Sequence, residues 1–201
     1  MNQSILISRL LTPALVIVIA AFAAIAQTET KPPADRDLDL TLQVLTTGSD
    51  PGAKAELPAN LAPIARQLKS ELGIANLRLA STFLGRTSTS GGYEYKSITE
   101  SLSPAADGEP PTFLEWSLNG VRTGSGGLYA QTFRFGARVP VRSTVMREDG
   151  GKPASMFSYE SIGLGINRLG LAEDQPILIG SLSLPRQNST LFLVLTVRPA
   201  K

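Results

Sequence analysis

Three arginines at even spacing are the feature of this sequence most able to bind a charged partner. Arg134, Arg138 and Arg142 follow one another at intervals of four residues. Side chains at even spacing in a β-strand project from one face, which places these roughly 13 Å apart. Gly136 and Pro140 lie between them, and the missing N–H of proline predicts a sheet edge or a bulge. The stripe is either a charge-guarded edge that discourages aggregation or an anion- or partner-binding face.

Acidic side chains are the other groups that could do chemistry, because the chain contains no His and no Cys. Disulfides, thiol nucleophiles, imidazole bases and ordinary zinc or haem sites are therefore excluded. A carboxylate-dependent hydrolase would have four candidate acids, namely Glu94, Glu100, Glu115 and Glu160. The sequence pairs no two of them at a catalytic separation. We predict a protein that is not an enzyme, with no catalytic residue, no cofactor and no metal site.

Asp35, Asp37 and Asp39 resemble the opening of a calcium-binding loop, but the pattern fails further along. Leu40 stands where such a loop needs Gly, and Thr46 stands where it needs Glu. The three carboxylates are therefore expected on the wet side of a strand.

Composition narrows the class of partner. The 201 residues include 19 basic and 17 acidic side chains, a net charge of +2. A chain so nearly neutral does not have the field of a nucleic-acid-binding protein, so no nucleic acid is expected as a partner. The length suits a single domain with a real core.

The N-terminus carries the pattern of a secretory signal. One positive charge at Arg9 precedes an apolar run that begins with residues 10–22 and ends in Ala24-Ile25-Ala26. This pattern predicts a signal peptide at residues 1–26, cleaved after Ala26. The polar, proline-containing residues 27–36 then form a flexible lead to a single domain at 37–201. We expect an exported protein, periplasmic or extracellular, whose mature chain has no transmembrane helix.

One helix and a series of strands must position these residues. An apolar stripe of Leu61, Ile64, Leu68 and Leu72 predicts a helix that Asn60 caps and Gly73 ends. Alternating polar and apolar residues predict a strand at 37–45. Further strands are predicted at 76–84, 93–98, 113–118, 128–141, 158–167, 177–184 and 191–197.

The turns predict how these strands connect. Residues 87–92 would close a hairpin, Asn119-Gly120 is a strong hairpin signal, and residues 123–127 read as a turn because no Lys or helix follows for a phosphate loop. Residues 191–195 are apolar on both faces, which predicts a central strand. The fold class is α+β, with one main helix packed on a mostly antiparallel sheet of about seven or eight strands.

Four segments in the second half resemble the β-domain of bacterial secretins, the ring proteins of type II and type III secretion and of type IV pili. Residues 136–141 are similar to its Gly-x-x-Val-Pro segment, and residues 159–166 to the Tyr-x-x-Val-Gly-x-x-Leu strand. Residues 174–182 and 191–199 resemble its last two strands, in the same order.

The departures from the secretin pattern bear on function. Ser181 stands where a second Gly would be, and a short turn at 185–189 replaces the gate-bearing insertion. The ring-forming domains that precede the β-domain in secretins are not recognised here. The resemblance implies a shared fold without a channel, so we expect a monomer or small homo-oligomer that does not conduct.

These observations predict an exported, non-enzymatic envelope protein that acts by binding a protein or a surface. The first alternative is a protein that binds an anionic small ligand or lipid headgroup through Arg134, Arg138 and Arg142. The carboxylate-dependent hydrolase is the weakest alternative.

Overall fold

The computed structural model describes residues 35–47, 57–99, 102, 110–145, 154–185 and 189–201. The predicted signal peptide, its cleavage site and nearly all of the predicted lead lie outside these residues. The described chain contains eight strands: β1 (Asp37–Thr47), β2 (Leu77–Ser88), β3 (Gly92–Thr99), β4 (Thr112–Gly124), β5 (Gly127–Val145), β6 (Ala154–Leu171), β7 (Ile177–Ser183) and β8 (Thr190–Pro199).

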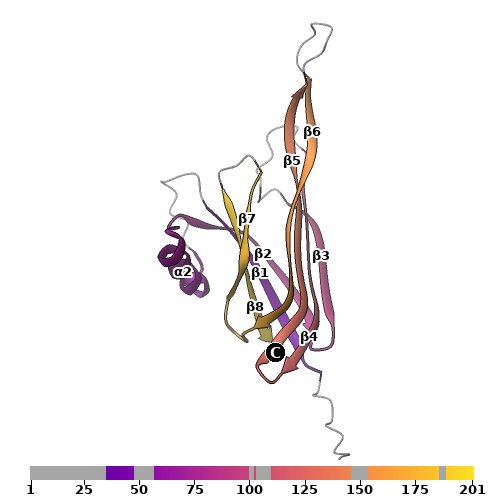
Figure 1. The fold of residues 1–201 in the computed structure, drawn as a ribbon. Coiled ribbons are helices and arrows are strands. Elements are labelled where there is room, and N and C mark those ends of the chain that lie inside the picture. Colours follow the sequence, from indigo (N-terminus) through magenta and orange to yellow (C-terminus); the bar gives the residue numbers. More distant parts are fainter. Residues whose placement is uncertain (1–34, 48–56, 100–101, 103–109, 146–153, 186–188) are drawn as a thin grey trace, which may run out of the picture. The chain divides into compact units, whose positions relative to one another are not determined.

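The strands form two antiparallel four-stranded sheets instead of the single sheet that we predicted (Figure 1). Sheet A has the order β2-β1-β8-β7, and sheet B has the order β3-β4-β5-β6. Every ladder except that between β1 and β8 joins strands adjacent in sequence. The chain therefore runs up and down through eight positions, and β1 meets β8 at the centre of sheet A.

Alternation explains how the sheets bury their inner faces. In β1, Leu38, Leu40, Leu42 and Val44 are buried, as the sequence predicted. They join one apolar cluster with inner residues of sheet B, of which Trp116 and Phe133 are the largest fully buried. The strand β8 is buried on both faces from Leu191 to Val197 and lies between β1 and β7, so its predicted central position is confirmed.

The predicted helix is present as α2 (Ala62–Leu72), preceded by a short 3-10 turn, η1 (Ala59–Leu61). Gly73 ends it at φ 69°, which confirms the predicted left-handed stop. Asn60 does not cap the helix, because its amide donates to Gln43 Oε1 at 3.1 Å. Leu72, expected on the apolar stripe, is 60% exposed.

Helix residues share a second buried cluster with sheet A. Leu61, Ile64 and Leu68 belong to this cluster together with Phe192 and Val194 of β8. Both sides of β8 therefore contribute to apolar clusters, which accounts for its run of consecutive apolar residues.

The predicted hairpin across residues 87–92 is wrong, because β2 pairs with β1 and β3 pairs with β4. The tight turn instead carries the chain from sheet A to sheet B. Tyr93 holds this corner: its hydroxyl donates to the Leu84 carbonyl at 3.1 Å, and its ring lies where a side chain on Gly85 would be. Burial of the phenol raises the pKa of Tyr93 above its ordinary value.

The predicted turn at Asn119-Gly120 is also wrong, since β4 runs on to Gly124 before the chain reverses. Gly120 lies in one row with Gln131 of β5 and Arg168 of β6, and the register is the same on both sides of that row. Gly120 and Arg168 adopt positive φ, 63° and 59°. Leu118 and Val121, three residues apart, are both buried. Each of the three strands thus inserts one residue, and the inward and outward positions exchange at this row.

Candidate functional site

The outer face of sheet B carries a strong excess of positive charge. Its described side chains include two acidic residues, Glu94 and Glu115, and six basic ones, Lys96, Arg122, Arg134, Arg138, Arg142 and Arg168. We call these six the basic face. The whole chain has a net charge of only +2, so its surplus of cations is concentrated on this surface.

The structure places the three predicted arginines on β5, all exposed and all on the outer face. Within the described residues Arg134 and Arg138 form no ion pair, while the guanidinium of Arg138 lies 4.9 Å from the ring centroid of Phe113. Beyond Arg138, β6 is the one ladder partner of β5 among the described residues, and Pro140 lies in this two-stranded part. The strand is therefore internal to the sheet at Arg134 and a local edge at Pro140, as a residue without an N–H requires.

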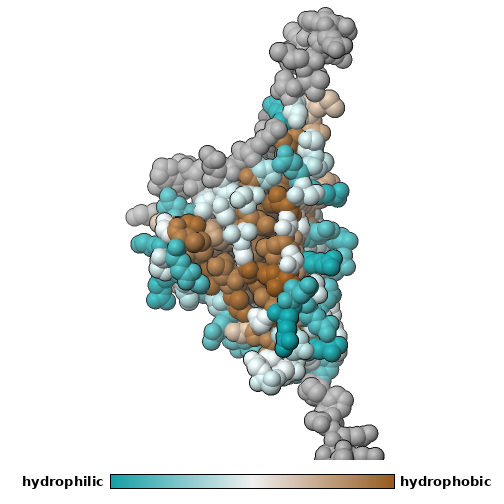
Figure 2. Space-filling model, in the orientation of Figure 1, coloured by the Kyte–Doolittle hydropathy of each residue, from teal (hydrophilic) through white to brown (hydrophobic). Residues whose placement is uncertain are grey.

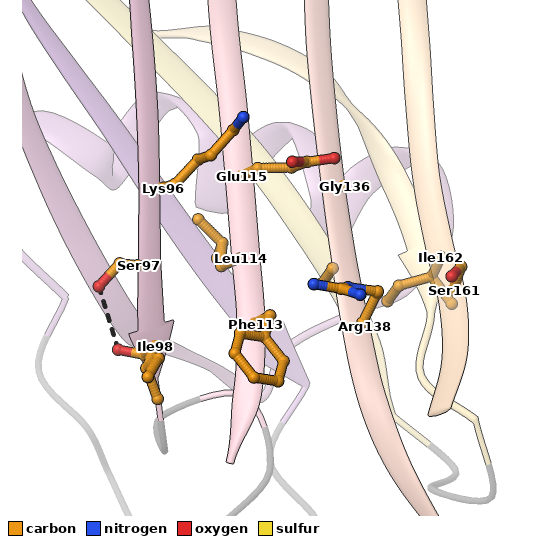
Figure 3. A pocket seen from close by; sticks show the side chains of 11 residues that line it. Lys96, Ser97, Ile98, Phe113, Leu114, Glu115, Gly136, Arg138, Ser161 and Ile162 are labelled. Atoms are coloured by element: carbon orange, nitrogen blue, oxygen red, sulfur yellow. Dashed lines mark hydrogen bonds between the residues drawn. The ribbon is translucent and has the colours of Figure 1, made fainter. Parts of the chain in front are cut away.

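Two shallow depressions adjoin each other on this face and share Glu115 and Gly136. The smaller, about 470 Å³, is bordered by Lys96, Phe113 and Arg138. Figure 3 shows the Glu115 side chain reaching from β4 towards Gly136, with Phe113 and Arg138 below it. The larger, about 850 Å³, has polar and charged walls and contains Arg134. The two run together along β5.

Glycines keep the floor of the larger depression low, for two different reasons. At Gly163 a Cβ atom would lie 2.6 Å from the Phe135 carbonyl oxygen, so the packing itself demands glycine. At Gly165 the nearest heavy atom, Arg134 Cγ, would be 4.0 Å away and φ is not positive. Packing does not explain Gly165, and glycine weakens a strand interior. Its evident effect is to leave the depression open.

Both described acids of the face line the larger depression, which brings together two carboxylates that the sequence left apart. Glu94 is held by Lys96, with Oε1 and Nζ 2.8 Å apart, and this hydrogen bond raises the pKa of Lys96. Glu115 extends over Gly136, within ordinary contact of a Cβ placed there. Glu160 lies on the opposite face, across from the buried Val139, and Glu100 lies outside the described residues.

Sequence reasoning missed the far end of the basic face. Arg122 lies opposite Tyr129, and the Arg168 guanidinium lies 5.6 Å from the Tyr129 ring centroid. The false turn at Asn119-Gly120 put Arg122 outside any strand, and the predicted strand over 158–167 stopped one residue before Arg168. If the inward–outward alternation of these strands is continued past Gly120 with a shift of one residue, both Arg122 and Arg168 fall on the outer face.

The aspartates near the start of the domain have structural partners. Asp39 accepts from Arg86 Nε at 2.8 Å, which also raises the pKa of Arg86. Asp35 accepts hydrogen bonds from Thr89 and Ser90 in the turn between the two sheets. Within the part of the chain that the structure describes, no three acidic residues gather closely enough to hold a metal ion.

A second surface lies where the free edges of β6 and β7 face each other. These strands share no ladder among the described residues, and Gly180 of β7 packs closely against Leu164 of β6. Partly exposed apolar side chains follow this corner: Ile162, Leu164, Ile166, Leu169, Ile177 and Leu182. Figure 2 shows apolar residues gathered where Figure 1 places β7 and the lower part of β6.

Two of the segments that resemble secretins are neighbours in the structure. Residues 136–141 of β5 pair with residues 158–163 of β6, and Gly163 and Gly165 lie inside β6. Gly180 lies inside β7 at a bulge.

Comparison with known proteins adds a weak resemblance. No protein-family model matches the chain, and no curated protein matches it. Among solved structures, the secretin-domain β-barrel of InvG from the Salmonella SPI-1 injectisome is 10% identical, with a TM-score of 0.25, over 93% of this chain and 68% of that one. A cryo-EM structure of the same secretin gives a TM-score of 0.22 at 10% identity, over 92% and 69%. Scores this low decide neither the family nor the function of this chain.

The structure also bears on membrane crossing by helices. In the described ranges, no helix combines the length and the apolar character needed to cross a bilayer.

Proposed function

We propose that this protein is an exported, non-catalytic binding protein whose basic face holds an anionic partner. The observation that carries the proposal is the pair Arg134 and Arg138. Both are exposed on one face, both border the depressions, and neither forms an ion pair within the described residues. By contrast, Arg36, Arg86 and Arg198 each pair with a carboxylate in the described chain. Arginine is also the side chain best suited to bind carboxylate or phosphate groups.

Binding fits this face better than catalysis. Two carboxylates that divide the roles of acid and base need different environments that push their pKa values apart. Glu94 and Glu115 instead lie in a shallow, open depression, and Glu94 is occupied by Lys96. A hydrolase using these two acids is the alternative. Steady hydrolysis of a glycan or ester substrate, abolished by Glu115→Gln, would establish it.

Export rests on the N-terminal pattern, which predicts a mature chain beginning at Gln27. Mass spectrometry of exported material should find that terminus; an intact Met1 would mean an anchored protein. Kinship with secretins rests on the order of four sequence segments. We expect single particles or small oligomers in negative-stain images, whereas defined rings with conductance in planar bilayers would contradict the non-channel hypothesis.

The proposal is tested by binding to anionic surfaces at low salt. Wild-type protein should bind phosphatidylglycerol vesicles and polyglutamate, and binding should fade as salt rises, because exposed charges are screened. Replacing Arg134, Arg138 and Arg142 with Gln should weaken binding while the circular dichroism spectrum is unchanged. Wild-type protein without affinity for any polyanion would leave only the charge-guarded edge.

A second candidate, strand addition, is favoured by the β6–β7 corner. Free strand edges beside partly exposed apolar side chains suit an extended, uncharged segment with apolar residues at alternate positions. Such a peptide should protect amides of β6 from hydrogen exchange. Exchange unchanged at β6 in the presence of saturating peptide would dismiss this candidate.

A further inference from the structure

We propose that the basic face binds an acidic polysaccharide, with the chain lying along β5. This inference rests on the proposed function and names its ligand: a linear glycan with repeated carboxylate groups. It follows from the length of the face, its relief and the kinds of side chain between the cations.

The face is too long for a small ligand. Its cations extend from Arg122, which lies opposite Tyr129, and Arg168, in the row of Gln131, to Arg142 near the far end of β5. From Tyr129 to Arg142 the strand covers about 40 Å at roughly 3.3 Å per residue. Arg134 and Arg138 divide this length. One small anion would occupy one of these positions, whereas a polymer with repeated anionic groups meets them in series.

The relief of the face favours a chain over a flat membrane. The two depressions adjoin, and Gly136, Gly163 and Gly165 form their low part between walls that carry Arg134, Arg138 and Glu115. Gly165 leaves space that its own packing does not need. A flat anionic bilayer would contact the projecting side chains and leave this floor empty, while a narrow polymer fills it.

The neutral polar groups of the larger depression match hydroxyl groups. Its lining includes Ser117, Asn119, Thr132 and Asn167, all on the outer face. Hydroxyl and amide side chains both donate and accept hydrogen bonds, as sugar hydroxyls do. A bound peptide would need hydrogen-bond partners for its backbone N–H and C=O groups. The backbone groups of β4 and β5 are already paired with the neighbouring strands on both sides. A glycan has no such requirement.

The aromatic rings do not favour nucleic acid. Proteins that bind single strands stack bases on open aromatic faces. Here the Arg138 guanidinium lies over Phe113, and that of Arg168 lies over Tyr129. Each cation–π contact covers one ring face and fixes a guanidinium in place for an anion.

The test compares polymers of matched length on the full-length mature chain: polygalacturonate, polyglutamate, single-stranded DNA and neutral dextran. Isothermal titration at low salt should show polygalacturonate bound most tightly and dextran not bound. The double variant Arg134→Gln/Arg138→Gln should weaken polygalacturonate binding by roughly one to two orders of magnitude, because it removes two charge-assisted contacts from an exposed face. The matched control is Arg86→Gln/Arg198→Gln, which removes the same charge from ion pairs off the face and should leave affinity nearly unchanged.

A second variant tests the floor without changing charge. Gly165→Val fills the depression where space exists, so it should fold and should weaken polygalacturonate more than polyglutamate. Equal affinity for both polymers, with no effect of Gly165→Val, would overturn the glycan while leaving an anion-binding face. Preference for DNA would overturn it in the same way. Binding of no polymer, or binding that ignores both arginines, would overturn the proposed function as well.

Discussion

Sheet A and sheet B contain the same number of strands, but their outer faces differ in burial. In sheet A, β8 is buried on both sides and the helix residues Leu61, Ile64 and Leu68 join its outer apolar cluster. In sheet B, the outer face is exposed and carries the charged, polar and glycine residues described above, together with the apolar Ile98 and Phe113. The outer side of β8 is therefore covered by helix residues, whereas the outer face of sheet B is exposed.

This difference in burial predicts a large loss of unfolding free energy on truncation in β8 and a small one on the outer face of sheet B. Leu193→Ala or Leu195→Ala removes a fully buried side chain from the centre of sheet A and should cost about 2–5 kcal/mol of unfolding free energy, through lost burial and a cavity. On the exposed side of sheet B, Asn167→Ala should stay within about 0.5 kcal/mol. Urea unfolding measures both.

Comparable small effects at all three positions would show that β8 is peripheral and that the comparison between the sheets fails. A turn substitution at Arg186 would have been a natural control, but that residue lies outside the described chain.

Two glycines two residues apart in β6 sharpen the comparison within sheet B. Gly163→Ala sets a Cβ against backbone of β5 and should cost about 1–3 kcal/mol, because the ladder itself must move. Gly165→Ala meets nothing closer than 4.0 Å and should stabilise by about 0.5–1 kcal/mol, since it restricts the unfolded chain.

Thermal unfolding of the two variants is the measurement. A gain at Gly163, or a loss at Gly165 as large as that at Gly163, would mean that the floor of the depression is fixed by packing throughout.

The fold was predictable where a pattern is local. Alternation, apolar runs and turn residues together predicted the positions of all eight strands, and the doubly apolar run predicted the central place of β8. The division into two sheets was not predictable, because the residues of a tight turn are of the same types whether the two flanking strands pair with each other or enter different sheets. The separation of β2 and β3 is seen in their ladders, in which β2 pairs with β1 and β3 pairs with β4, and Tyr93 packs against Gly85 at the corner between them.

The candidate site was predictable only in part. Arg134, Arg138 and Arg142 follow a strict period of two, and the structure keeps them on one face. Lys96 lies on another strand, and its place beside Glu115 depends on a register that no turn in the sequence specified. Arg168 lies in the row where alternation shifts and Arg122 lies beyond it, so a fixed period of two could not place either residue on the face.

That row can be tested at Arg168, whose φ of 59° is unfavourable for any side chain. Arg168→Ala keeps the unfavourable conformation and loses the contact with Tyr129, so it should cost about 0.5–1 kcal/mol. Arg168→Gly loses the same contact but relieves the backbone and should be close to wild type. If Ala were better tolerated than Gly by urea unfolding, residue 168 would not adopt the left-handed conformation in solution.

The smallest expected effect concerns the link between the two sheets. Hydrogen bonds from Thr89, and then from Ser90, lower the pKa of Asp35 below its ordinary value of 3.8 and tie the start of β1 to the turn that leads from β2 to β3. A carboxyl group whose folded pKa is lowered stabilises the fold above its unfolded pKa, and that contribution disappears as pH falls through the folded value. Wild-type protein should therefore be slightly more stable than Asp35→Asn at pH 7, and the difference should shrink below pH 3.8.

Melting temperatures of both proteins from pH 2 to 7 measure this difference. The control is Asp37→Asn, which removes the same charge two residues further along the chain. A constant difference across the whole range would mean that the aspartate acts through its shape and hydrogen bonds in either ionisation state, and that charge at this corner does not help to join sheet A to sheet B.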